Sequence, residues 1–319
     1  MQRIELTLTA EDKIRLLGWR CIPDLKPPRA CILILHGMAE HIQRYETFSE
    51  FLCEKGYAVY GFDLRGHGRT GDMAAASGIL AAENGWDRTL SDIDLWVERI
   101  RKDYPESPIV LFGHSMGSLL AKCYAAKQGN KIKGLILSGP VANPGFLRIL
   151  ASFLAWGNGL INGRNAPARL LDRLIFKGYG RSIKDRRTDF DWLSRDERQV
   201  DAYLRDPHCG RIMSIGFYQD LLKGLQMAYK QSTYRSTPKD LQIYIFGGSK
   251  DPVGKFSKGI SSLYKEYRRA GVSNVTMKFY SDGRHEMLNE TNRDEVYKDV
   301  LSWLNDKFPP PSEAANPRN

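Results

Sequence analysis

One short segment, Gly-His-Ser-Met-Gly at residues 113–117, constrains the fold more than any other part of this sequence. It follows an apolar run with high β-propensity at residues 108–112 and precedes a run typical of a helix at residues 118–126. A strand that turns directly into a helix needs small residues around the turn, because a Cβ there would collide with neighbouring backbone. The sequence therefore predicts a strand–turn–helix that exposes the Ser115 hydroxyl at the carboxyl edge of a sheet, above a helix N-terminus.

A Gly-x-Ser-x-Gly turn of this kind is typical of a serine nucleophile. A serine hydroxyl is a weak nucleophile near neutral pH, so it needs a base and a group that orients the base. The five-residue pattern alone often arises by chance, and an ordinary turn is the alternative interpretation. The identity of the partner residues therefore decides between the two interpretations.

Two later segments end in residues that suit these partner roles. Residues 241–246 predict a strand that leads into a turn with Asp251, and residues 275–280 predict a strand that leads into a loop with His285. In this arrangement Asp251 orients His285, and His285 accepts the proton of Ser115. The chain order of serine, acid and histidine is that of the α/β-hydrolase triad. A turn-forming aspartate before a proline and an ordinary loop histidine are the alternatives.

An earlier strand also ends in a turn that suits this chemistry. Residues 30–35 predict a strand that runs into a His-Gly turn, and loops of this kind supply one backbone N–H of an oxyanion hole. The other donor follows the nucleophile, so the N–H groups of Met38 and Met116 are the candidates. A simple tight turn is the alternative, and the sequence indicates no partner for Glu40 or His41.

Together these motifs resemble the monoacylglycerol lipase and lysophospholipase branch of the α/β-hydrolases, which is also described as serine-aminopeptidase-like. The resemblance rests on five segments in the expected order, at residues 36–45, 63–69, 113–118, 247–253 and 283–286. It implies an α/β-hydrolase fold, with a mostly parallel central sheet flanked by helices and an inserted helical cap. It also implies Ser115, Asp251 and His285 as the triad, with Met38 and Met116 as oxyanion donors. Ser118 stands where monoacylglycerol lipases usually have glycine, a small change that should not alter the reaction class.

The same resemblance implies a serine hydrolase that cleaves carboxylic esters of monoacyl lipids, either monoacylglycerols or lysophospholipids. The reaction passes through an acyl-enzyme intermediate and needs no metal and no organic cofactor. A carboxylesterase for small soluble esters would share every catalytic residue. A peptidase is disfavoured, because an amino terminus would need acidic residues whereas the predicted cap is basic. A catalytically silent binding or signalling protein is a further alternative, but such proteins often lose a triad member.

The alternation of predicted strands and helices breaks between residues 141 and 235. Elsewhere, short connections between strands and helices indicate a mostly parallel sheet covered on both faces. The interrupting segment has helical patterns and no convincing strand. We therefore predict a hydrolase core formed by residues 1–140 and 236–308, a helical cap at residues 141–235, and a disordered tail at residues 309–319.

The predicted cap begins with an apolar stretch at residues 146–156 and is strongly basic. It holds 16 Lys and Arg against 9 Asp and Glu, which is +7 of the net charge of +10. An apolar lip beside a basic surface would favour peripheral contact with anionic membranes or phosphate-bearing lipids. A helix buried against the core and incidental surface charge are the alternatives. No nucleic-acid recognition motif accompanies the charge, so we expect no nucleic-acid partner.

The five cysteines are odd in number and scattered along the chain. They form no Cys-x-x-Cys pair, and no His/Cys cluster has the spacing of a metal site. Reduced and mostly buried thiols in a cytoplasmic protein are therefore expected. The first residues alternate like a strand rather than a signal peptide, and no apolar run reaches the roughly 18 residues of a membrane span.

Overall fold

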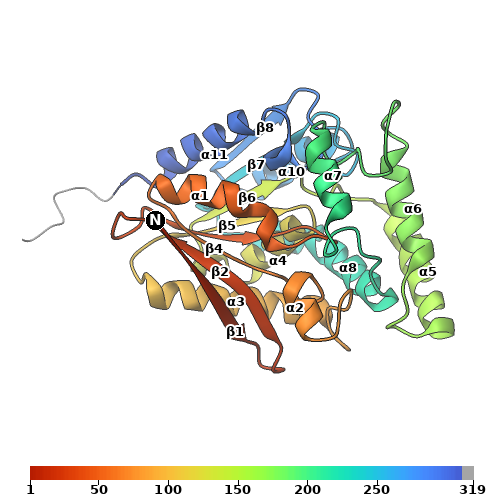
Figure 1. The fold of residues 1–319 in the computed structure, drawn as a ribbon. Helices are drawn as coiled ribbons and strands as arrows, with labels where there is room; N and C mark the ends of the chain where they lie inside the picture. The colour runs from red at the N-terminus through yellow and green to blue at the C-terminus, as the bar shows by residue number, and fades with distance from the viewer. Residues whose placement is uncertain (311–319) are drawn as a thin grey trace, which may run out of the picture.

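The computed structural model describes residues 1–310, and in this part of the chain one eight-stranded sheet lies between two layers of helices (Figure 1). The strand order is β1-β2-β4-β3-β5-β6-β7-β8. Strand β2 pairs antiparallel with β1 and β4, and the remaining neighbours pair in parallel. The strands are β1 (Gln2–Thr9), β2 (Arg15–Ile22), β3 (Cys31–Leu35), β4 (Ala58–Phe62), β5 (Ile109–His114), β6 (Gly134–Ser138), β7 (Gln242–Gly248) and β8 (Val275–Tyr280).

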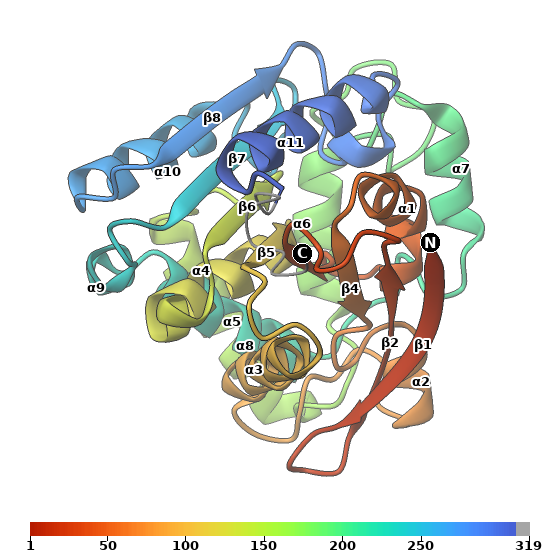
Figure 2. The same cartoon turned by 90° about the vertical axis from the view of Figure 1, so that its left-hand side faces the viewer.

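Helices cover both faces of the sheet (Figure 2). One face carries α1 (Glu46–Glu54) and α11 (Arg293–Lys307). The other carries α3 (Gly85–Asp103), α4 (Met116–Gln128), α8 (Ile215–Ala228) and α10 (Lys258–Arg269). The other helical segments are α2 (Gly68–Met73), α5 (Phe146–Asn162), α6 (Arg169–Gly180), α7 (Glu197–Arg205), α9 (Gln231–Ser236), and the 3₁₀ turns η1 (Ile42–Tyr45), η2 (Gly129–Lys131) and η3 (Met287–Asn289).

The central strands are apolar throughout because both of their faces are covered. All five residues of β3 are buried. Successive side chains point to opposite faces, so Ile32 and Ile34 pack with α1 and α11, whereas Leu33 and Leu35 pack with α3 and α4. The expected mostly parallel sheet with two covered faces is confirmed.

Helix α2 forms although its sequence does not favour a helix. Residues 68–73 form this helix with Gly68 and Gly71 inside it, and glycine disfavours a helix. Tertiary contacts hold this short helix, since Asp63 accepts the N–H of Arg69 at 2.9 Å and the Thr70 hydroxyl accepts the N–H of Leu17 at 2.9 Å.

The segment between β6 and β7 contains helices α5 to α9 and one isolated bridge between Pro167 and Ser214. Helices α5 and α6 stand apart from the sheet, whereas α8 packs against α3 and α4, and α9 packs against α4 (Figure 1). The end of this segment thus belongs to the helical layer on the sheet. The cap boundaries at residues 141–235 stay a prediction. Apart from residues 309 and 310, the predicted tail lies outside the described residues.

Candidate active site

Ser115 lies in the turn between β5 and α4. Its φ of 52° and ψ of −116° are unusual for a residue with a side chain. Hydrogen bonds fix this conformation, because the Ser115 N–H donates to Ser138 O at 3.1 Å and the Ser115 carbonyl accepts the N–H of Ser118 at 2.9 Å. A Cβ on Gly113 would lie 2.7 Å from the carbonyl carbon of Gly117, so the turn needs glycine there. The strand–turn–helix expected from the sequence is present.

His285 and Asp251 form a buried hydrogen-bonded pair. The His285 Nδ1 atom lies 3.0 Å from Asp251 Oδ2, and the other oxygen of Asp251 accepts the N–H of Val253 at 2.8 Å. The two residues follow β8 and β7, as the sequence predicted. Burial alone lowers the pKa of His285, but the charge of Asp251 and its hydrogen bond outweigh this effect and raise that pKa above its ordinary value of 6.5.

Ser115 and His285 line the same cavity, which has a volume of about 110 Å³. Met38 and Met116 line it too. Within residues 1–310, the N–H groups of these two methionines have no protein acceptor. Most of the remaining wall is apolar and comes from the segment between β6 and β7: Ile175, Phe176, Tyr179, Trp192, Leu193, Tyr203, Leu221 and Leu225. The structure therefore brings four of the candidate residues to one cavity, with Asp251 hydrogen-bonded to His285.

His114, the other histidine in this cavity, has a different environment. Its ring centroid lies 4.7 Å from that of His285, and its Nδ1 atom lies 3.3 Å from the Ser138 hydroxyl. Burial and the nearby charge of His285 lower the pKa of His114 to about 4. His114 is therefore neutral at pH 7, which agrees with a packing role beside Ser115.

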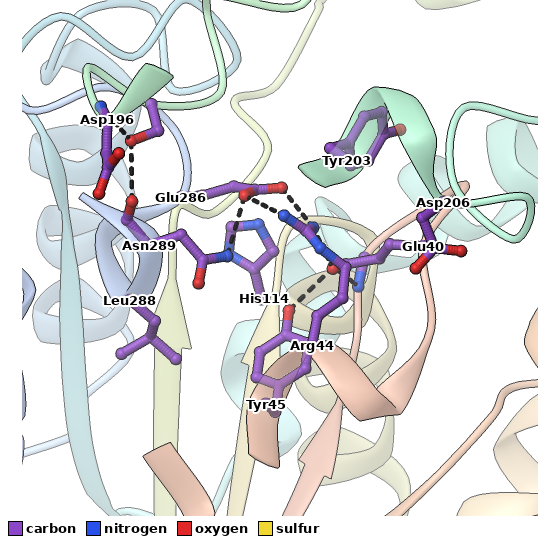
Figure 3. A network of polar contacts seen from close by, with 12 residues as sticks. Glu40, Arg44, Tyr45, His114, Asp196, Tyr203, Asp206, Glu286, Leu288 and Asn289 are labelled. Carbon is purple, nitrogen blue, oxygen red and sulfur yellow. Dashed lines mark hydrogen bonds and ion pairs between the residues drawn. The ribbon is translucent and has the colours of Figure 1, made fainter. Parts of the chain in front are cut away.

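Figure 3 shows a buried ion-pair network that the sequence did not predict. Two of its members, Glu40 and Glu286, line the cavity. Arg44 forms two parallel hydrogen bonds of 2.6 Å with the carboxylate of Glu286 and a third of 2.7 Å with Glu40. The Tyr45 hydroxyl donates to the other oxygen of Glu40 at 2.9 Å. Burial would raise the pKa of Glu40, but the charge of Arg44, the nearby His114 and His36 and the Gly37 N–H together outweigh burial and hold that pKa at about 2. The network is therefore ionised at pH 7.

This network joins the two loops that meet at Ser115. Glu40 also accepts the N–H of Gly37, the residue before Met38, at 2.5 Å. Glu286 directly follows His285. Loss of Arg44 would leave two buried carboxylates without a compensating positive charge, which is strongly destabilising. The short spacing of Glu40 and Arg44 was a local signal, but Glu286 lies 242 residues from Arg44 and could not be paired with it from the sequence.

A loop before α7 also fixes the loop that carries His285, through backbone hydrogen bonds. The N–H of His285 donates to Trp192 O at 3.3 Å, and the N–H of Glu286 donates to Leu193 O at 2.7 Å. The Trp192 ring packs 5.3 Å from the ring of His285. These positioning residues were not predicted from the sequence, because they lie in an irregular stretch of turns and bends whose contacts are made through its backbone.

Comparison with known proteins places these features in a described family. A family model described as serine aminopeptidase, S33, matches residues 26–292. A monoacylglycerol lipase of Mycolicibacterium smegmatis is 29% identical over 88% of this chain and 90% of its own length. Phospholipase YtpA of Bacillus subtilis is 29% identical over 85% of this chain and 93% of its own length. A monoglyceride lipase of Mus musculus is 27% identical over 88% of this chain and 84% of its own length.

Solved structures agree with this placement. A thermostable carboxyl esterase from Bacillus coagulans has a TM-score of 0.90 and 25% sequence identity, with 97% of this chain and 99% of that chain covered. A lipase in an open form has a TM-score of 0.85 and 28% sequence identity, with 97% of this chain and 100% of that chain covered. These likenesses confirm the predicted α/β-hydrolase fold, the resemblance to the monoacylglycerol lipase branch and the prediction of a carboxylic ester hydrolase. Because the family model spans most of the sequence, the chain belongs to the serine aminopeptidase (S33) family of α/β-hydrolases.

Proposed function

We propose that this protein hydrolyses carboxylic esters of monoacyl lipids, either monoacylglycerols or lysophospholipids, with Ser115, His285 and Asp251 as its catalytic triad. One observation carries the proposal: the 3.0 Å hydrogen bond between His285 and Asp251 lies beside a cavity that is lined by both His285 and Ser115. A histidine held by a buried carboxylate and adjacent to a strained serine is the arrangement that acyl transfer requires.

In the proposed mechanism, Ser115 attacks the ester carbonyl while His285 Nε2 accepts its proton. Asp251 accepts the Nδ1–H of His285, which leaves Nε2 free as the base and stabilises the imidazolium that forms. The N–H groups of Met38 and Met116 stabilise the oxyanion. His285 then returns the proton to the leaving alcohol, and water cleaves the acyl-enzyme by the same route. No step uses a metal or an organic cofactor.

Replacement of the nucleophile tests the proposal directly. Ser115→Ala should lower the rate of hydrolysis of a chromogenic ester by about 10⁴-fold or more, because no covalent intermediate can form. Ser118→Ala is the matched control, since its hydroxyl donates to the Ser115 carbonyl at 2.6 Å and does not reach the substrate in this mechanism. Circular dichroism checks the fold of both variants. Substantial turnover by folded Ser115→Ala would refute the triad.

The pH dependence of the reaction tests the base. The kcat/KM for a soluble ester should rise with pH as His285 loses its proton, with a midpoint above pH 6.5. Asp251→Asn removes the charge that favours the imidazolium, so this midpoint should fall while kcat drops by about 10⁴-fold. Asp282→Asn, which changes an exposed residue of the loop that carries His285, should change neither value. An unchanged or higher midpoint in Asp251→Asn would contradict the assignment.

The preference for lipid rests on the chemistry of the helices around the cavity. The wall contributed by α6 and α8 includes Ile175, Phe176, Leu221 and Leu225, which suits an acyl chain. A carboxylesterase for small soluble esters is the second candidate, because a cavity of about 110 Å³ would accommodate a short acyl group without any opening of the helices above it.

A series of soluble esters of increasing acyl length separates these candidates. Each methylene buried against an apolar wall contributes about 0.8 kcal/mol, so kcat/KM should rise about fourfold per methylene up to at least about eight carbons. A steep fall beyond about four carbons would favour the small-ester carboxylesterase.

Contact with a lipid surface is the second part of the proposal. The outer faces of α5 and α6 expose large apolar side chains: Phe146, Leu147, Phe153, Trp156, Leu160, Ile161, Leu170 and Leu174. Exposed basic residues accompany them at Arg164, Arg169 and Arg173. An exposed apolar face with basic neighbours favours adsorption to an anionic bilayer. Within residues 1–310, the structure contains no helix with the length and apolar character needed to cross a membrane.

Substitutions on this face test the surface contact. The double variant Phe153→Ser with Trp156→Ser should bind anionic vesicles about tenfold or more weakly, because two large apolar side chains no longer leave water. Hydrolysis of monoacylglycerol in those vesicles should fall in parallel, while a soluble short-chain ester is cleaved at nearly the same rate. Cosedimentation and product release measure the two effects. Unchanged vesicle binding would contradict the contact.

A further inference from the structure

A second cluster of reactive side chains lies outside the cavity, between the loop after β3 and the loop after α7. His41, Asp206 and Cys209 each direct one donor atom into it, and these three atoms lie within 4.8 Å of one another. Backbone contacts fix the two loops, since the N–H of Gly210 donates to Ala39 O at 2.9 Å. The cluster therefore joins segments that are 165 residues apart in the sequence.

The donors form a set that suits a divalent transition metal. Zinc binds imidazole nitrogen, thiolate sulfur and carboxylate oxygen at about 2.0–2.3 Å, often with three protein ligands and one open position. His41 and Cys209 are buried, and Asp206 is partly buried. The His41 Nε2 atom already lies 2.7 Å from Asp206 Oδ2. An ion would replace the proton shared by these two atoms. The nitrogen and oxygen would then move apart, and the sulfur would move inward to bonding distance.

His208 lies next to the cluster and is a further potential ligand. Its ring centroid lies 5.5 Å from that of His41. Its Nδ1 atom is buried and has no hydrogen-bond partner in the described part of the chain, although Asp72 Oδ2 lies 3.4 Å away. Buried polar atoms nearly always have a hydrogen-bond partner, so this nitrogen, with only an ion-pair contact to Asp72, is unusual.

The charges around the cluster also suit a cation. Asp206 and a Cys209 thiolate would together neutralise a divalent ion. Two arginines border the cluster, but each is already paired with carboxylates: Arg44 with Glu40 and Glu286, and Arg211 with Asp72 at 2.5 Å. Their positive charges are thus largely compensated before an ion binds.

We propose that His41, Asp206 and Cys209 bind one divalent ion of the zinc class, with His208 or water in the fourth position. The ion ties the loop after α7 to the loop that carries Met38. It takes no part in the ester hydrolysis proposed above, so the two proposals stand independently. The sequence alone predicted no metal site, because His41 is too distant along the chain from Asp206 and Cys209 to form a recognisable spacing.

Cobalt provides a direct optical probe of the site. The full-length protein is freed of metal with a chelator and titrated with Co²⁺. We expect one equivalent to produce a thiolate-to-cobalt charge-transfer band, because only a bound cysteine gives such a band, and we expect Zn²⁺ to abolish it by displacement. The band should persist in Cys123→Ala, a buried cysteine of α4, and be absent from Cys209→Ser.

A second variant keeps the test decisive if Cys209→Ser does not fold. Asp206 is partly exposed, and Asp206→Asn can still hydrogen-bond to His41. It should retain the apo fold by circular dichroism and weaken Co²⁺ binding by about tenfold or more. Zn²⁺ should raise the Tm of the wild type more than that of Asp206→Asn. No charge-transfer band in the wild type, a band that survives in Cys209→Ser, or equal affinity in Asp206→Asn would overturn the proposal.

Discussion

The arrangement of the site depends on one buried carboxylate that must keep hydrogen-bond partners. Asp251 is fully buried, and it accepts the N–H of Val253 and bonds to His285. Because β7 and β8 pair in parallel, the loops that follow them meet at the same edge of the sheet. Strand β5 ends at that edge too, directly before Ser115. The parallel strands thus bring residues from three distant parts of the sequence to the same edge of the sheet.

Further buried contacts fix the positions of Ser115, His285 and Asp251. Arg44 fastens the loop that carries Met38 to the loop that carries His285, through Glu40 and Glu286. The backbone of Trp192 and Leu193 holds the His285 loop from the side of the inserted helices. Groups fixed in this way need little rearrangement as charge develops in a reaction, which is the basis of electrostatic preorganisation. The inserted segment therefore does more than cover the cavity, because it supports the histidine.

Sequence reasoning succeeded where the physical cause is local. The glycines of the Ser115 turn, the apolar run of β3 and the turn after β7 are each specified within a few residues, so their positions follow from spacing and side-chain size. The partners that come from distant loops could not be found in this way: Glu286 for Arg44, and Trp192 for the His285 loop. Likewise, α2 contains glycines that disfavour a helix, but it forms because Asp63 and strand β2 make hydrogen bonds to it. Tertiary contacts decide these cases.

The central claim is that the Ser115 hydroxyl is the nucleophile that His285 activates. Its most direct measurement is mass spectrometry of the protein after reaction with a phosphonyl fluoride, which forms a stable adduct only with an activated serine. The account predicts one adduct, located on the peptide with Ser115, and labelling that becomes far slower in His285→Ala. An adduct on any other residue, or labelling of Ser115 that is indifferent to His285, would contradict it.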